Sequence, residues 1–206
     1  MIAPRFYYMR YRLVVCGGTF DHFHKGHKKF LEFVFSIGQN TIVGITSDNY
    51  LKSSKFKVTA SQRGEQSSKF IEEFKIRKNS VLSFLKNKKL QESVEITKID
   101  DLFGPTLDKG LQIEAIVVEE ETKKGAEIIN RKRKELGLKD LKILIAPLVK
   151  AEDGGIISSG RIRKGAIDRN GKLYVDSLWL KKTLILPESL REELKKPFGT
   201  ILINNV

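Results

Sequence analysis

Short β-branched segments alternate along this chain with longer segments of helical periodicity, and this alternation limits the possible folds more than any other feature. We predict five strands, at residues 11–16, 41–46, 94–99, 113–118 and 141–146. Apolar residues at helical spacing predict helices at 26–37, 69–86 and 125–136. Strands that are joined through helices run parallel, and the helices then cover both faces of the sheet. The sequence therefore predicts an α/β fold with a doubly wound, parallel, five-stranded sheet.

Glycine and polar residues mark the ends of these elements. We expect Gly38 to end the first helix as its C-cap, where glycine is strongly favoured. Residues 48–68 are polar and basic, and they predict irregular structure. The second helix is expected to bury an apolar stripe that consists of Phe70, Ile71, Phe74, Val81, Leu82 and Leu85.

The character of the sequence changes near residue 168. Asn170 and Gly171 lie between two apolar runs, which is typical of a hairpin turn. A short amphipathic segment and a final β-rich run follow. We therefore predict a main domain at 10–167 and a small C-terminal appendage at 168–206.

Composition limits the setting of the protein. The chain of 206 residues has one cysteine, Cys16, which excludes an intramolecular disulfide and a cysteine-rich zinc module. No apolar run approaches the roughly 20 residues that span a bilayer, and the first residues lack the pattern of a secretory signal. We therefore expect a cytoplasmic protein with no membrane partner, in which Cys16 is a small core residue.

Positive charge is in excess, with 38 Lys and Arg against 25 Asp and Glu, a net charge of +13. Such a field attracts polyanions, which include nucleic acids and small phosphorylated metabolites. Composition does not choose between them, and a solvated charged surface explains many of the lysines equally well. The chain has no recognisable nucleic-acid-binding motif, so we expect no nucleic-acid partner.

The histidines of the protein lie within six residues and are His22, His24 and His27. They follow Gly17 and Gly18 at the predicted turn from the first strand to the first helix. In a doubly wound sheet, ligands bind beyond the carboxyl ends of the strands. A glycine-rich turn there lets the backbone approach a phosphate, and free N–H groups of the next helix point at it. His24 and His27 can then hold one polyphosphate, with Gly26 leaving room for a nucleotide.

Other interpretations of this cluster stay open from the residues alone. Imidazole is a common metal ligand, but no cysteine or well-spaced acidic ligand accompanies these histidines. The histidines can also be surface or helix-capping residues, and the two glycines can be only a tight turn.

Two motifs resemble signatures of the nucleotidylyltransferase superfamily. The segment GGTFDHFHKGH, residues 17–27, resembles its H-x-G-H signature, and ISSGRIR, residues 157–163, resembles ISSTxIR with Gly160 in place of threonine. Between them, DLFGP at 101–105 and VEEET at 118–122 resemble the archaeal and eukaryotic type of phosphopantetheine adenylyltransferase. This resemblance implies a Rossmann-like fold. It also implies transfer of AMP from ATP to 4′-phosphopantetheine, which yields dephospho-coenzyme A and pyrophosphate in coenzyme A biosynthesis.

The resemblance further implies roles for individual residues. The catalytic residues are His27, which donates to the α-phosphate, and His24, which donates to the β-phosphate. The implied nucleotide site comprises Gly17, Gly18, Thr19, Phe20, His24, Gly26, His27, Glu120, Thr122, Ser158, Ser159 and Arg161. The implied acceptor site comprises Thr19, Lys52, Lys55 and Asp101. Mg²⁺ is expected to arrive with ATP, and no metal is expected to be held by the protein alone.

Two alternative functions remain. The first is another nucleotidylyltransferase, such as a cytidylyltransferase, that acts on a different phosphorylated acceptor. The second is a basic nucleic-acid-binding protein. Residues 186–199 resemble the opening of the archaeal GTP-dependent dephospho-coenzyme A kinases, and we interpret them as a partial kinase-like fragment or a structural arm without kinase activity. The sequence does not indicate an oligomeric state.

Overall fold

A computed structural model of the chain describes residues 11–53 and 70–175. The chain divides into two compact units, Met1–Tyr174 and Val175–Val206, and every element named below belongs to the first. Lys55 and the kinase-like segment at 186–199 lie outside the described residues, so those expectations stay predictions.

The strands form one parallel sheet in the order β3-β2-β1-β4-β5. Their bounds are β1 Tyr11–Gly18, β2 Gly38–Thr46, β3 Val94–Ile99, β4 Ala115–Val118 and β5 Lys142–Ile145. The predicted doubly wound, five-stranded sheet is confirmed. The chain starts at the central strand β1, adds β2 and β3 on one side, and then crosses to the other side for β4 and β5.

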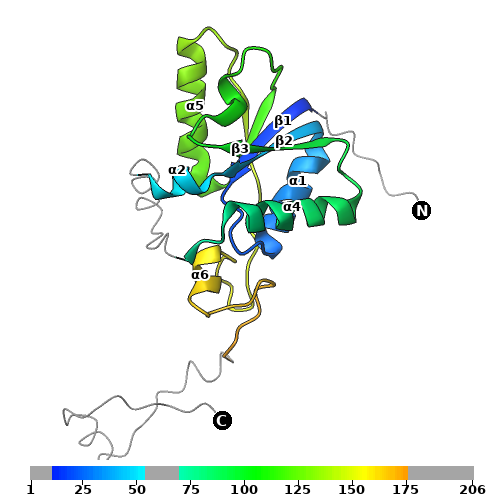
Figure 1. Cartoon of the computed structure of the whole chain (residues 1–206), viewed down its shortest axis with the longest axis vertical. Helices are drawn as coiled ribbons and strands as arrows, with labels where there is room; N and C mark the ends of the chain where they lie inside the picture. The colour runs from blue at the N-terminus through cyan, green and yellow to red at the C-terminus, as the bar shows by residue number, and fades with distance from the viewer. Residues whose placement is uncertain (1–10, 54–69, 176–206) are drawn as a thin grey trace, which may run out of the picture. The chain divides into compact units, whose positions relative to one another are not determined.

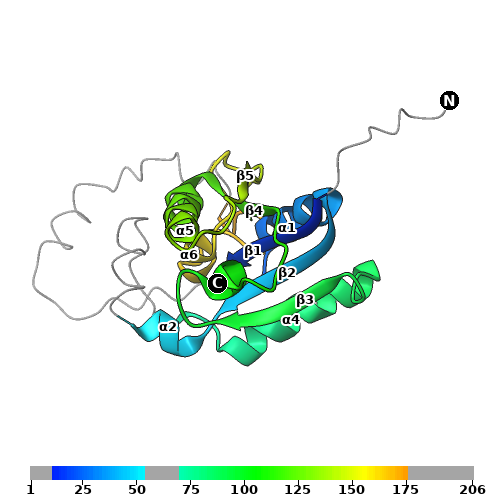
Figure 2. The same ribbon diagram turned by 90° about the horizontal axis from the view of Figure 1, so that it is seen from above.

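Helices cover both faces of this sheet, as predicted. The α-helices are α1 Lys25–Ile37, α2 Asp48–Lys52, α4 Phe74–Lys88, α5 Lys123–Glu135 and α6 Ser159–Arg163. Two 3₁₀ turns, η2 Gly104–Leu107 and η3 Glu120–Thr122, precede and follow β4. Figure 1 shows α5 on one side of the sheet and α1 and α4 on the other, and Figure 2 shows the same arrangement from above.

Alternate residues of β1 belong to different cores, because successive side chains of a strand point to opposite faces. Val14 and Cys16 pack with the core residues of α1 and α4, whereas Val15 packs with those of α5. The expectation that Cys16 is a core residue is confirmed, since its side chain is buried and burial raises the pKa of its thiol. The two cores hold β1 rigidly and therefore fix the position of the turn that follows it.

The expectation of irregular structure from residue 48 onward is wrong for residues 48–52, which form α2. Ser47 is the N-cap of this helix, and its hydroxyl accepts a hydrogen bond from the Tyr50 N–H at 3.0 Å. The helix is only five residues long, too short for apolar periodicity to reveal it. It positions Tyr50 at the carboxyl end of the sheet.

The predicted second helix is confirmed as α4, but it begins at Phe74 rather than near residue 69. The carboxylate of Asp48 accepts a hydrogen bond from the Phe74 N–H at 2.9 Å, which starts the helix there. Phe70 therefore precedes the helix and is 70% exposed, and Leu82 on the outer face is 40% exposed. The predicted apolar stripe is wrong for Phe70 and Leu82.

Two predicted turns are confirmed. Gly38 ends α1 as its C-cap and is also the first residue of β2, so the strand begins three residues earlier than predicted. The predicted turn at Asn170-Gly171 is present, because the Gly171 N–H donates to the Asp168 carbonyl and Ile167 pairs antiparallel with Leu173. Over residues 11–53 and 70–175, no helix combines the length and apolarity that crossing a bilayer requires.

Candidate active site

A cleft of about 600 Å³ lies at the carboxyl ends of the strands, where the chain changes direction across the sheet. Its walls come from β1, β2, β3 and β4, from η2 and η3, and from the first turns of α5. Six of the residues that the sequence assigned to nucleotide or acceptor line this cleft: Gly17, Gly18, Thr19, Asp101, Glu120 and Thr122. The fold thus brings together residues that lie a hundred positions apart in the chain.

The turn between β1 and α1 contains two non-glycine residues in the left-handed region, Phe20 with φ 54° and His22 with φ 45°. Such residues persist only where the surroundings hold them firmly, and they concentrate at functional sites. The Phe20 ring is buried and lies 5.3 Å from the His27 ring, centroid to centroid. Phe20, which the resemblance assigned to nucleotide binding, therefore packs against the His27 imidazole.

The H-x-G-H motif forms a capping box at the start of α1. The His24 ring is the N-cap, and its Nδ1 accepts from the Gly26 N–H at 3.1 Å and the His27 N–H at 3.4 Å. The His27 Nδ1 in turn accepts from the His24 N–H at 3.4 Å. This is the reciprocal arrangement that N-cap and N3 side chains usually make with Ser and Glu. The spacing of three residues between the histidines is the spacing that the box requires.

The first N–H groups of α1 are all engaged by the chain itself. The Lys25 N–H donates to the Arg169 carbonyl at 2.8 Å. The two imidazoles accept from the N–H groups of His24, Gly26 and His27. The expectation that free N–H groups at this helix start point at a phosphate is therefore wrong. Because both Nδ1 atoms are acceptors, each neutral ring carries its proton on Nε2. At this helix start the N–H groups left without a partner role in the capping box are therefore those on the imidazole Nε2 atoms, not those of the backbone.

Both imidazoles are neutral at physiological pH. Burial lowers the pKa of His24 to about 4, an effect that Arg169 and His22 add to and the Asp21 carboxylate partly offsets. Burial, with a smaller contribution from the His24 ring, lowers the pKa of His27 well below 6.5. The two rings stack with centroids 3.8 Å apart, which two imidazolium cations would not tolerate. The pair can therefore donate hydrogen bonds to an anion without carrying a charge of its own.

Gly26 is required by the His24 ring itself. A Cβ at this position would lie 2.9 Å from both Cε1 and Nδ1 of His24. The sequence-based reason was room for a nucleotide, and the structure supplies a second reason, room for the capping imidazole. Any side chain at Gly26 would push the ring out of the position in which it accepts from the helix.

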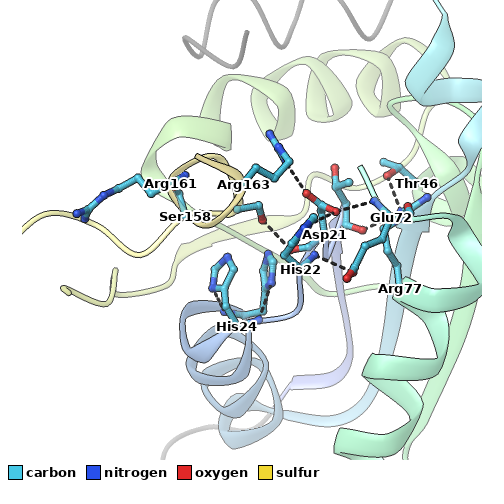
Figure 3. Close-up of polar contacts among 12 residues, drawn as sticks. Asp21, His22, His24, Thr46, Glu72, Arg77, Ser158, Arg161 and Arg163 are labelled. Carbon is cyan, nitrogen blue, oxygen red and sulfur yellow. Dashed lines mark hydrogen bonds and ion pairs between the residues drawn. The ribbon is translucent and has the colours of Figure 1, made fainter. Parts of the chain in front are cut away.

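Asp21 lies within the histidine motif and was not predicted as a site residue, but it is buried and bonds to several segments of the chain. Its carboxylate accepts from the Glu72 N–H at 2.9 Å, lies 2.8 Å from the His22 Nδ1, and forms an ion pair with Arg163. Its carbonyl accepts from the Ser159 hydroxyl at 2.7 Å. Figure 3 shows Asp21 at the centre of these contacts, with Arg163 reaching it from α6. Asp21 therefore joins the histidine-bearing turn to α6.

The ISSG segment forms the start of α6, but its polar groups already have partners within the chain. Ser158 is the N-cap and accepts from the Arg161 N–H at 3.4 Å, while Ser159 donates to Asp21. The Arg161 guanidinium pairs with Asp153 and points away from the Asp21 cluster (Figure 3). None of these residues lines the cleft in this arrangement. Their assignment to ATP phosphates stays a prediction, and the second arginine of the motif, Arg163, is the one that faces the turn.

The remaining predicted residues differ in their placement. One carboxylate oxygen of Asp101 accepts from the N–H groups of Phe103 and Gly104, so Asp101 shapes the DLFGP wall of the cleft. Thr122 forms a capping box with Glu119 at η3. Lys52 is exposed at the end of α2 and is not among the residues that line the cleft.

Two buried arginines hold the cleft walls, and neither was assigned to the site from sequence. Arg77 of α4 is fully buried and donates to the Thr19 carbonyl at 2.7 Å. Arg133 of α5 is 3% exposed and donates to the carbonyls of Thr106 and Lys139. Arg77 ends the segment FKIR, residues 74–77, which resembles the Y-x-x-R helix start of the same adenylyltransferase type and is the one sequence signal that pointed toward it.

Comparison with known proteins agrees with this geometry. The Cytidylyltransferase-like family model matches residues 15–165. The chain is 37% identical over 164 residues to the phosphopantetheine adenylyltransferase of Methanothermobacter thermautotrophicus, which covers 80% of this chain and 90% of the relative. It is 39% identical over 161 residues to the enzyme of the same name from Thermococcus gammatolerans, with 78% and 93% coverage.

Among solved structures, a protein of unknown function from Archaeoglobus fulgidus superposes with a TM-score of 0.51 at 31% sequence identity, covering 65% of this chain and 96% of that one. Residues 15–165, which the family model matches, include the H-x-G-H capping box and every residue that lines the cleft. The chain therefore belongs to the phosphopantetheine adenylyltransferase family of the cytidylyltransferase-like proteins.

Proposed function

We propose that this protein transfers an adenylyl group from ATP to 4′-phosphopantetheine, giving dephospho-coenzyme A and pyrophosphate. The observation that carries the proposal is the stacked pair of neutral imidazoles at the start of α1, in the segment that follows the cleft-lining residues Gly17, Gly18 and Thr19. The chain also matches curated phosphopantetheine adenylyltransferases over nearly their whole length. An acceptor phosphate oxygen attacks the α-phosphorus in line, and the bond to the pyrophosphate oxygen breaks. No covalent enzyme intermediate is needed, so the protein supplies position and hydrogen-bond donors.

The histidines act in this proposal as neutral donors. The Nε2–H of His27 donates to an α-phosphate oxygen as negative charge builds there, and that of His24 donates to the β-phosphate. Because the Nδ1 atoms accept from the helix N–H groups, the partial positive charge of the helix start polarises both rings toward the ligand. Removing one such donor from a transition state typically lowers the rate 10²–10³-fold.

We further propose that Mg²⁺ enters bound to ATP. Within the part of the chain that the structure describes, the one group of three potential metal ligands is Asp21, His22 and Glu72. Both carboxylates are already ion-paired, Asp21 with Arg163 and Glu72 with Arg169. These residues therefore do not suit a resident cation, and the nucleotide phosphates are the natural ligands for Mg²⁺.

The nucleotide and the acceptor are tested together by following pyrophosphate release. The purified protein is incubated with Mg-ATP or Mg-CTP and with 4′-phosphopantetheine, glycerol 3-phosphate or choline phosphate. We expect release with ATP and 4′-phosphopantetheine only, and mass spectrometry of the product as dephospho-coenzyme A. Turnover with CTP and another acceptor, but not with this pair, would assign the chain to a different reaction of the same superfamily.

The remaining alternative, nucleic-acid binding, is addressed by the same preparation. Phosphate-mediated binding of DNA or RNA weakens steeply as salt is raised. We expect no such salt-dependent binding, since the described site is built around a cleft of small-molecule size. The cytoplasmic setting stays a prediction from the sequence, based on the single cysteine and on the lack of a membrane-length apolar run and of a secretory signal pattern.

A further inference from the structure

The guanidinium of Arg77 makes an unusual set of contacts for a fully buried charge. Nε donates to the Glu72 carbonyl and Nη1 to the Thr19 carbonyl, each at 2.7 Å. Nη2 pairs with the Asp48 carboxylate at 2.7 Å, and the Thr46 hydroxyl lies 3.4 Å from Nη1. One side chain thus bonds to the turn after β1, the end of β2, the start of α2 and the segment before α4. Figure 3 shows Arg77 next to Glu72 and Thr46.

Stability alone does not account for these contacts, because burying the Arg77 charge costs free energy. Burying an arginine requires removing its charge from water, and a packed apolar residue often serves a core equally well. The carboxylate of its partner Asp48 is 38% exposed, so the ion pair offsets only part of the free energy lost when the Arg77 charge is removed from water. What an apolar residue cannot supply is the planar fork, which holds several acceptors at fixed angles.

The groups that Arg77 joins form one side of the cleft. Thr19 and Thr46 line it directly, and α2 contributes Tyr50 to its wall. Thr19 is also the residue before the strained turn at Phe20, which leads to the histidine pair. The hydrogen bonds that Arg77 makes within the described part of the chain reach Glu72, Thr19, Thr46 and Asp48, and none of them reaches β4 or η3. Arg77 therefore fixes the spacing between the histidine-bearing turn and α2.

We propose that Arg77 is a positioning residue for adenylyl transfer, which holds Thr19 and α2 at the separation that aligns the acceptor phosphate with the histidine-bound nucleotide. The proposal rests on the proposed function. Arg77 touches no substrate and acts through the backbone of Thr19 and through Asp48. An in-line displacement is sensitive to such alignment, and a shift of about 1 Å costs on the order of 10²-fold in rate.

The test is Arg77→Lys, which keeps the charge but replaces the fork with a single ammonium group. We expect kcat/KM for 4′-phosphopantetheine to fall about 10²-fold. The dissociation constant of Mg-ATP, measured by calorimetry without acceptor, is expected to stay near that of the wild type. The matched control is Val81→Ala on the same helix, which is fully buried and apolar, so it lowers stability without touching the fork.

The outcomes separate the two proposals. Wild-type turnover with 4′-phosphopantetheine establishes the proposed function before any variant is compared. Unchanged kcat/KM in folded Arg77→Lys, or an equal loss in Val81→Ala at the same folded fraction, would overturn the role of Arg77. If Arg77→Lys does not fold, Asp48→Asn carries the test, because it removes the charge that pairs with Arg77 while its amide oxygen can still accept from the Phe74 N–H. A raised KM for the acceptor in Asp48→Asn supports the proposal, and an unchanged KM contradicts it.

Discussion

Replacing His24 with asparagine tests the electrostatic account of the capping box through stability. His24 is 4% exposed, and its pKa of about 4 lies below the ordinary 6.5. As the pH falls below 6.5, the unfolded chain takes up a proton at His24 that the folded chain refuses, so this residue makes folding less favourable. The loss starts near pH 6.5, reaches about 2.5 kcal/mol at pH 4.5 and is complete below pH 4. Asparagine is a good N-cap and does not titrate, so His24→Asn removes this loss while keeping the cap.

The assay is urea unfolding of wild type and His24→Asn at pH 7.5, 5.5 and 4.5, with linear extrapolation to water. Protonation of carboxylates such as Asp48 destabilises both proteins equally in acid. Burial raises the pKa of Asp48, but the hydrogen bonds from Phe74 and Arg77 outweigh this effect and lower the pKa below its usual value. The difference between them isolates His24. We expect the wild type to lose about 2.5 kcal/mol more than the variant between pH 7.5 and 4.5. Parallel losses in the two proteins would refute the neutral, buried state of His24.

Three further predictions concern activity. His27→Ala is expected to fold normally and to lower kcat 10²–10³-fold in a pyrophosphate-release assay, and unchanged turnover would exclude a catalytic role. Because the pKa of both imidazoles is lowered, neither changes its protonation between pH 6 and 8, and kcat is expected to show no histidine titration in this range. A change in kcat with a midpoint near pH 6.5 would contradict this. Gly160→Thr is expected to fold, since a Cβ there meets only the Ser158 hydroxyl at 3.9 Å, and to lower the KM for ATP by restoring the family hydroxyl. A raised KM would show that Gly160 is needed as glycine.

The strands could be predicted from the sequence because each is a short apolar run bounded by glycine or polar residues. The runs TIVGIT at 41–46 and VEITKI at 94–99 are strands in the structure at nearly the predicted bounds. The histidine motif also fell where expected, directly after β1. The short helix α2 was not predicted because five residues are too few to show a helical period. It is held instead by the Ser47 cap and by the hydrogen bond from the Phe74 N–H at the start of α4 to Asp48.

The roles of individual polar groups were harder to predict, since a local pattern does not reveal a partner far along the chain. Ser159 belongs to a motif associated with phosphate, yet its hydroxyl donates to Asp21, 138 residues away. The first N–H groups of α1 are taken by two imidazoles and by the Arg169 carbonyl, which arrives from the far end of the domain. The FKIR segment pointed to Arg77, but nothing local in the sequence shows that this arginine is buried between Thr19 and Asp48.

The sequence by itself determined the α/β class and the position of the histidine pair, because periodicity and side-chain type are local properties. Only the tertiary structure decided that the imidazoles are neutral and that Arg77 is buried. Burial and long-range hydrogen bonds set the protonation and orientation of a side chain, and both arise only when distant segments pack together.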